Sequence, residues 1–241
     1  MTTEVIVTQQ FCGPPNSGNG GYVCGLMAKA FGGTVTGVLR APIPLDTPLK
    51  LSVEGGMVRI LGGHGAVIAE ARQSDPAALP AMGPPPSLDA ARQAARDFIG
   101  LKRMFHPICF TCGIDQAEGF GLRVFVSPVG PASDGEVAGV WTPHPSFAAD
   151  DGLTRLEVVW AALDCPGSVA WVERESGGGL LGTMTCQVLR RPSPDEPCIV
   201  TARPIEASGR KRVAATALFS AEGELLARSH QIWIVRAPAP V

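Results

Sequence analysis

Polar and apolar residues alternate along several stretches of the chain, and this period of two predicts β-strands. In the first half such stretches cover residues 34–42, 48–61 and 65–73. In the second half they cover residues 180–191, 198–206, 211–220 and 223–235, and shorter ones lie at 4–9, 122–126 and 136–141. Turn residues separate neighbouring stretches, so we expect antiparallel strands joined by short connections.

Two other segments repeat their apolar residues at intervals of three and four, which predicts buried helices. The first spans 19–31 and follows a loop rich in Gly, Pro, Asn and Ser, and the second spans 153–164. Their apolar faces contain Tyr22, Leu26 and Met27 in one helix and Leu156, Val159, Trp160 and Leu163 in the other. Each helix precedes a run of strands, so we expect two units, each with one helix and an antiparallel sheet.

An internal repeat supports the same division of the chain. The string GTVTGVLR begins at Gly33 and the string GTMTCQVLR at Gly182, and identical residues recur at an offset of 149 or 150 positions. Duplication of one ancestral unit explains the match, and chance similarity in a chain rich in Ala, Gly and Pro is the alternative. We therefore expect a first unit at 1–80, a linker with a helix capped by Ser87 at 81–104, and a second unit at 105–241.

The composition limits the classes of protein to which the chain can belong. Of its 241 residues, 45% are hydrophobic and 17% charged, which excludes disorder as the main state. The net charge of −2 includes no long basic run, so neither nucleic acid nor a membrane is expected as a partner. The chain has no apolar stretch of about 18 residues and no signal-peptide pattern, so we expect a cytoplasmic location. Its seven scattered cysteines indicate thiols rather than a disulfide framework.

Two short motifs resemble those of a known enzyme family. Residues 109–126 contain CFTCG followed by GFGLRVFV, and Asn19-Gly20-Gly21 opens the first predicted helix. In these features the chain resembles the double-hotdog acyl-CoA thioesterases, particularly those of the phenylacetate-pathway type. The resemblance implies an α+β fold of two fused hotdog units, each an antiparallel β-sheet wrapped around a central α-helix.

The resemblance also implies an active site at the interface of the two units. Family members present backbone N–H groups of the glycine motif, here Gly20 and Gly21, to a thioester carbonyl. An acidic residue nine positions after the first motif residue acts as nucleophile or general base. Nine positions after Asn19 stands Ala28, whereas Asp164 takes the equivalent place in the second unit. The resemblance therefore implies a single site that combines the glycine motif of one unit with the carboxylate of the other.

Three further residues are expected at this site. Thr183 follows Asp164 near the place where the family keeps a hydroxyl group that orients water. Asn16 precedes the glycine motif, where related enzymes place an amide near the substrate carbonyl. Arg190 is one of several basic residues that suit the phosphates of coenzyme A.

These residues also have ordinary structural interpretations. The glycines can form the turn that starts a helix, Asn16 can form a turn, and Thr183 is a common type of strand residue. Asp164 can cap a second helical segment that contains Pro166 and runs to about Arg174. An acid at the end of an apolar stretch is equally typical of a catalytic carboxylate with a raised pKa.

One group of residues has the chemistry of a metal site. Cys109, Cys112 and His106 offer three ligands of the kind that zinc binds. No second pair of Cys or His follows at metal-binding spacing. We therefore interpret the cysteines as packed thiols and expect no metal and no cofactor, with the coenzyme A thioester as substrate only.

Hydrolysis of an acyl-CoA or a similar acyl thioester is the function that these features favour. Because a thioester is already activated, an oxyanion donor and a carboxylate suffice. A hotdog protein that binds acyl-CoA without turnover, as a sensor or carrier-protein partner, is the alternative. Hydration of an enoyl thioester is disfavoured, because Asp150 and Asp151 precede the second helix without a following His. Edge-to-edge pairing of units also predicts a homo-oligomer of pseudodimers, in the simplest case a dimer.

Overall fold

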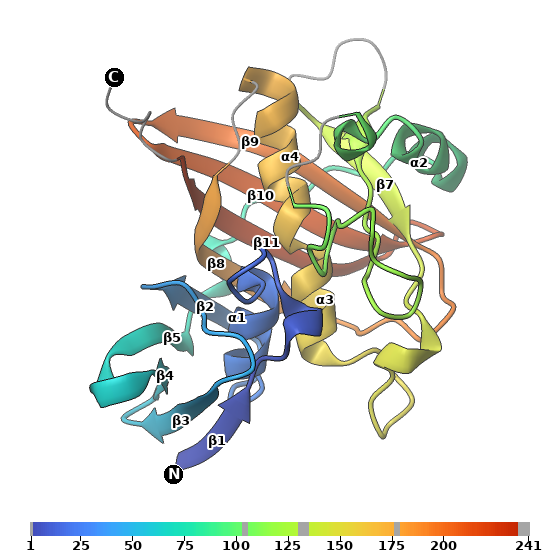
Figure 1. The fold of residues 1–241 in the computed structure, drawn as a ribbon. Helices are drawn as coiled ribbons and strands as arrows, with labels where there is room; N and C mark the ends of the chain where they lie inside the picture. Colours follow the sequence, from blue (N-terminus) through green and yellow to red (C-terminus); the bar gives the residue numbers. More distant parts are fainter. Residues whose placement is uncertain (1, 103–105, 130–134, 176–178, 236–241) are drawn as a thin grey trace.

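A computed structural model describes residues 2–102, 106–129, 135–175 and 179–235. The helices are α1 (Gly20–Ala28), α2 (Leu88–Ala95), α3 (Leu156–Ala162) and α4 (Asp164–Glu175). The strands are β1 (Thr2–Ile6), β2 (Thr34–Leu39), β3 (Pro48–Glu54), β4 (Met57–Leu61), β5 (Val67–Gln73), β6 (Ser127–Pro128), β7 (Val137–Trp141), β8 (Leu180–Val188), β9 (Cys198–Ser208), β10 (Lys211–Ser220) and β11 (Leu225–Ile234). These strands form one continuous sheet in the order β1-β3-β4-β5-β2-β8-β11-β10-β9-β7-β6 (Figure 1).

The strand order is the same in both halves of the sheet. Outward from the centre it runs β2-β5-β4-β3-β1 in the first half and β8-β11-β10-β9-β7 in the second, where β6 adds one more strand. The halves meet where β2 pairs antiparallel with β8, and Thr36 lies opposite Thr185. The hydroxyl groups of these two threonines, which occupy equivalent positions of the internal repeat, lie 2.7 Å apart. The predicted α+β fold, with a helix against each half of an antiparallel sheet, is confirmed.

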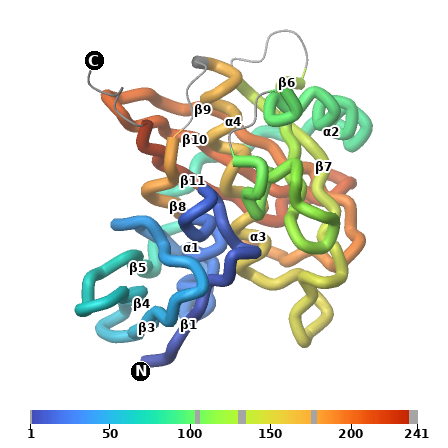
Figure 2. Tube along the Cα trace, viewed as in Figure 1, coloured from blue at the N-terminus to red at the C-terminus, as the bar shows by residue number. Residues whose placement is uncertain are grey.

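Helices α1 and α3 pack against each other between the two halves, as the trace in Figure 2 shows. Two glycines on one face of α1 allow this close approach. A Cβ atom at Gly25 would lie 2.5 Å from the Cα atom of Glu157. A Cβ atom at Gly21 would lie 2.8 Å from both the Trp160 carbonyl oxygen and Asp164 Cβ. Because both positions lack a side chain, the backbone of α1 reaches the start of α4.

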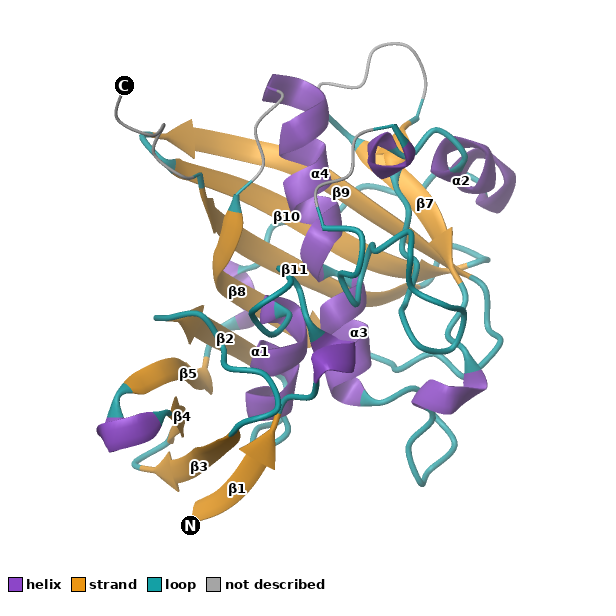
Figure 3. Ribbon diagram, viewed as in Figure 1, coloured by secondary structure: helices purple, strands orange, loops and turns teal. Residues whose placement is uncertain are grey.

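Helix α4 lies along the second half of the sheet (Figure 3). The Trp171 indole N–H donates a hydrogen bond of 3.0 Å to the Val213 carbonyl of β10. At the junction between α3 and α4, the side-chain amide of Gln231 donates a bond of 2.6 Å to the Leu163 carbonyl. These bonds to the sheet hold the junction in place, and Asp164 is the first residue after it.

Three expected elements differ from the structure. The stretch 48–61 is two strands rather than one, because Gly55 and Gly56 adopt φ values of 57° and 71° and form a tight turn. The stretch 122–126 is not a strand, because its N–H groups bond to the loop at 110–111 instead of to a neighbouring strand. The predicted helix 153–164 begins at Leu156 and is followed by a separate helix, α4.

The segment between the two halves carries the expected helix. Ser87 caps α2 by accepting a hydrogen bond of 3.2 Å from the Ala90 N–H, and the helix ends at Ala95. The expected boundary between linker and second unit, at 104/105, lies outside the described residues. Within the described part of the chain, no helix has the length and apolar character needed to cross a membrane.

Candidate active site

A cavity of about 740 Å³ lies between the two halves of the molecule. The first half contributes the loop before α1 and the segment after β2, at residues 13–20 and 39–43. The second half contributes residues 179–182 and the side chains of His106, Cys109, Asp164, Cys165, Trp233 and Ile234. The cavity therefore combines apolar walls with a few polar groups, as small-molecule sites do.

Asp164 is the buried acid of this cavity, with only 3% of its surface exposed. Its Oδ2 atom accepts a hydrogen bond of 2.9 Å from the Gly21 N–H of the other half. Its Oδ1 atom is buried and has no hydrogen-bond partner within the described ranges. The carboxylate accepts no bond from the first turn of α4, so it does not cap that helix, and one oxygen is left for another group.

Burial raises the pKa of Asp164 to about 7, because the charged form has lost its contact with water. The Gly21 N–H lowers the pKa, the Cys109 thiol raises it, and the Asn19 side chain lowers it, each by less than the effect of burial. At neutral pH both the carboxylate and the carboxylic acid are therefore populated. Such a group can accept a proton and return it.

The two glycines have different roles in the structure. The N–H of Gly21 points at Asp164 and is not available to a ligand. Gly20 is the first residue of α1, lines the cavity, and has an N–H group without a partner among the residues described. Of the two predicted backbone donors, only Gly20 is free to bind a carbonyl oxygen, and Gly21 instead positions the acid.

Asn19 links the two halves from the N-terminus of α1. Its Oδ1 accepts a hydrogen bond of 2.9 Å from the Tyr22 N–H and so caps α1. Its Nδ2 donates a bond of 3.1 Å to the Thr111 hydroxyl, which in turn donates a bond of 2.8 Å to the Ala161 carbonyl of α3. Thr111 was not among the predicted site residues, although it lies inside the CFTCG motif that signalled the resemblance. Asn19 therefore lines the cavity, and its side chain joins the start of α1 to the loop that carries Thr111.

The structure brings only some of the predicted residues to the cavity. Asn16 is exposed and lines the cavity opening. Thr183 lies on β8 between Val38 and Ile232 and is not among the cavity-lining residues. Arg190 is also outside the cavity, where Glu196 and Glu224 bind its guanidinium group at 2.7 and 3.1 Å.

Arg40, the repeat equivalent of Arg190, lines the cavity instead. Its guanidinium group lies 2.5 Å from Glu70, and 56% of the side chain remains exposed. The internal repeat contains both arginines in its VLR string, so the sequence did contain a signal for this position. Only the packing of the two halves decides which arginine faces the cavity.

The cavity wall also includes the cysteine thiols of Cys109 and Cys165. The pKa of Cys109 is held well below its usual value, because the thiols of Cys112 and Cys165 and the N–H groups of Cys112 and Thr111 all point at its sulfur. By contrast, burial raises the pKa of Cys12 to about 11. The pKa values of Cys112 and Cys165 are in turn raised well above the usual value, mainly because their thiols hydrogen-bond to Cys109.

Comparisons with known proteins bear on the fold. No protein-family profile matches the sequence, and no curated protein matches it. Similar solved structures include a protein of unknown function with a hot dog fold from Alicyclobacillus acidocaldarius, 16% identical, with a TM-score of 0.66 over 99% of this chain and 94% of that one. They also include the acyl-CoA thioesterase II TesB2 of Mycobacterium marinum, 17% identical, with a TM-score of 0.61 over 99% and 94% of the two chains. The tesB protein of Mycobacterium avium subspecies paratuberculosis is 15% identical, with a TM-score of 0.62 over 98% and 93%. The chain has a double-hotdog fold.

Proposed function

We propose that the protein hydrolyses acyl-CoA or a similar acyl thioester at one active site between its two halves. The observation that carries this proposal is the free, buried Oδ1 atom of Asp164 beside a cavity that the unpaired Gly20 N–H also lines. The fold is similar to that of a structure described as an acyl-CoA thioesterase, which agrees with this chemistry.

Asp164 is the proposed general base. Because Gly21 holds Oδ2, the Oδ1 atom is free to accept a proton from a water molecule. The water oxygen then bonds to the acyl carbon, and the carbonyl oxygen gains negative charge. The C–S bond breaks next, the leaving thiolate takes the proton from Asp164, and the products are a carboxylic acid and a thiol. A carboxylate with a pKa of about 7 can perform both proton transfers at neutral pH.

Gly20 is the proposed donor to the developing oxyanion. Its N–H lies at the N-terminus of α1, where the helix dipole adds to the hydrogen bond. A Cβ atom here would lie 2.7 Å from Leu39 and 3.0 Å from Leu181. Leu39 and Leu181 therefore pack directly on Gly20, and a residue with a side chain could not keep its N–H in this place.

The cavity also suits the two ends of an acyl-CoA. Leu39, Ile43, Leu181 and Trp233 offer apolar surface to an acyl chain. Arg40 is exposed and lines the same cavity, and its guanidinium group suits the phosphates of coenzyme A. We assign to Arg40 the binding role that the sequence suggested for Arg190.

The test is hydrolysis of a panel of acyl-CoA compounds, followed by thiol detection, with Asp164→Asn as the variant. We expect turnover to fall by about 10² or more, because general-base catalysis contributes about that much. Asp97→Asn, which removes an exposed acid outside the cavity, is the matched control and should remain fully active. Acyl-CoA binding should survive in Asp164→Asn.

Two results would contradict the proposal. Full activity of Asp164→Asn would remove the carboxylate from the mechanism. Binding of acyl-CoA by the unaltered chain, with no hydrolysis of any compound in the panel, would instead identify a binding module.

A further inference from the structure

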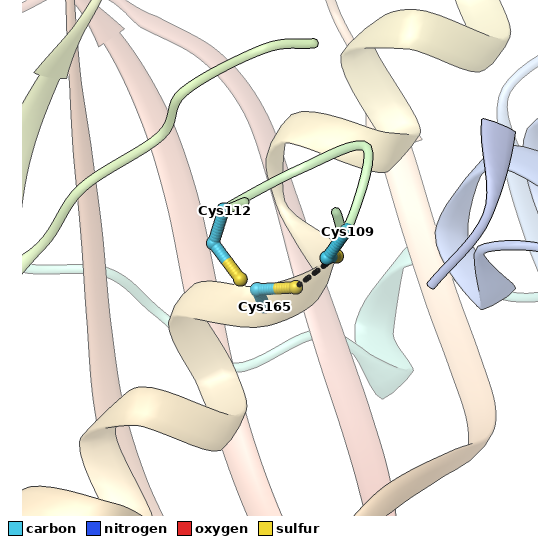
Figure 4. Close-up of side chains that lie close together, drawn as sticks. All are labelled: Cys109, Cys112 and Cys165. Atoms are coloured by element: carbon cyan, nitrogen blue, oxygen red, sulfur yellow. Dashed lines mark hydrogen bonds between the residues drawn. The ribbon is translucent and has the colours of Figure 1, made fainter. Parts of the chain in front are cut away.

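Three cysteine thiols converge beside the cavity from two segments that are far apart in the sequence (Figure 4). Cys109 and Cys112 lie on the loop that precedes β6, and Cys165 is the second residue of α4. The three Sγ atoms all lie within 4.8 Å of one another, and those of Cys109 and Cys165 are 3.5 Å apart. Within the described ranges, no other three His, Cys, Asp or Glu side chains gather in this way.

The spacing of the sulfur atoms fits a metal better than it fits a disulfide. Zinc binds thiolates at about 2.3 Å in a tetrahedral arrangement, which places the sulfur atoms about 3.8 Å apart. The Cys109 and Cys165 sulfurs are 3.5 Å apart and no pair is separated by more than 4.8 Å, so small side-chain movements would suffice. A disulfide would require about 2.05 Å and would leave the third thiol unused.

The loop turns tightly between Cys109 and Cys112. The loop is closed by a hydrogen bond of 2.8 Å from the Gly113 N–H to the Cys109 carbonyl. A Cβ atom at Gly113 would lie 2.5 Å from that carbonyl oxygen, so a glycine is required after the second cysteine. This tight turn holds Cys109 and Cys112 close to each other and to Cys165.

Two other cysteines show what an ordinary packed thiol does in this protein. Cys12 donates its S–H to the Ile108 carbonyl at 3.0 Å, and Cys198 donates to the Glu196 carbonyl at 3.4 Å. Both sulfurs therefore act as donors, in the protonated form. The Cys109 sulfur instead faces the thiols of Cys112 and Cys165.

We propose that Cys109, Cys112 and Cys165 bind a divalent zinc-type cation through three thiolates. A tetrahedral ion has one further position, which suits a water molecule from the cavity that Cys109 and Cys165 line. Such an ion ties the CFTCG loop to the start of α4. Because Thr111 on this loop holds Asn19, the ion also stabilises the contact between the two halves. Metal binding requires no hydrolase activity, so its test is separate from that of the proposed function.

In the experiment, the full chain is first reduced and freed of metal with a chelator. It is then titrated with Co²⁺ under anaerobic conditions. We expect one equivalent to bind, with thiolate-to-cobalt absorption in the near ultraviolet and the strong visible bands of tetrahedral cobalt, and Zn²⁺ to displace it. Cys112→Ser and Cys165→Ser should each weaken binding by at least about tenfold and lower the thiolate absorption per cobalt by about a third. Cys198→Ser should bind as the unaltered chain does.

A second measurement needs no variant. Zn²⁺ should slow the alkylation of Cys109, Cys112 and Cys165 in the unaltered chain, as measured by mass spectrometry of peptides, and leave the rate at Cys12 unchanged. The proposal is overturned if the reduced chain binds no Co²⁺ with thiolate absorption, or if Zn²⁺ protects none of the three thiols. Unchanged cobalt spectra in a folded Cys165→Ser variant would equally contradict it.

Discussion

Replacing Asp164 by Asn should change how the stability of the protein depends on pH. The variant keeps the size of the side chain and an oxygen atom for the Gly21 N–H, but it removes the titrating proton. In the folded protein the pKa of Asp164 is raised from 3.8 to about 7, mainly by burial. The folded state therefore binds one more proton than the unfolded state between these two pH values.

The size of the effect follows from linkage. A raised pKa gives stability that is fully present below the unfolded pKa and is lost as the pH rises through the folded pKa. The slope between them is about −1.4 kcal/mol per pH unit for one proton. From pH 3.8 to about 7 the unaltered chain thus loses about 4 kcal/mol of unfolding free energy through this single group.

Urea unfolding at several pH values from about 5 to 8 measures this effect, with a reductant and a chelator present so that the neighbouring thiols stay reduced and metal-free. The quantity of interest is the unfolding free energy of the unaltered chain minus that of Asp164→Asn, because other titrating groups cancel in the difference. This difference should fall by about 1.4 kcal/mol per unit up to about pH 6.5 and level off above about 7.5. Asp97→Asn should follow the unaltered chain throughout. A difference that stays flat with pH would show that Asp164 is not desolvated in the folded state.

Two further substitutions test the geometry of the site. Gly21→Ala introduces a Cβ atom 2.8 Å from Asp164 Cβ and from the Trp160 carbonyl oxygen. The free energy of unfolding, measured by heat or urea, should therefore fall by about 1–3 kcal/mol, and turnover should also fall. Gly32→Ala is the control, because its Cβ atom meets no other atom within 4 Å, and it should change neither quantity. Arg40→Gln should raise KM for acyl-CoA several-fold with kcat unchanged, and should not affect an acyl thioester that lacks the nucleotide. Arg190→Gln should leave both constants unchanged, and the reverse result for the two arginines would refute the assignment of Arg40.

The repeat made much of the fold predictable. The strings that begin at Gly33 and Gly182 cover β2 and most of β8, the two strands that meet at the centre of the sheet. Alternation located most strands because each has one face against the core. It missed the turn at Gly55–Gly56, which requires two residues with positive φ, and it wrongly made 122–126 a strand.

The site was less predictable, because it depends on contacts between residues far apart in the sequence. The carboxylate of Asp164 was expected to act together with the glycine motif, and it does contact Gly21. That contact uses the Gly21 N–H, one of the two backbone donors that we predicted for the substrate carbonyl. The sequence does not reveal this, because the contact depends on how α1 and α3 cross. In the same way, a search for paired cysteines finds Cys109 and Cys112 but cannot find Cys165, which the start of α4 brings to them.

The crossing of α1 and α3 also supports one active site per chain rather than two. Where the first half has Gly21, the second half has Glu157, and where the second half has Asp164, the first half has Ala28. Glu157 is buried and forms an ion pair of 2.8 Å with Lys29, which compensates its charge where α1 and α3 meet. The position that would accept a second catalytic acid is thus apolar, and the place of its glycine partner is filled by a paired carboxylate. The two halves thus have the same strand order in the sheet but different residues at equivalent positions of α1 and of the α3–α4 segment. The proposed site requires this difference, because it needs a glycine from one half and an acid from the other.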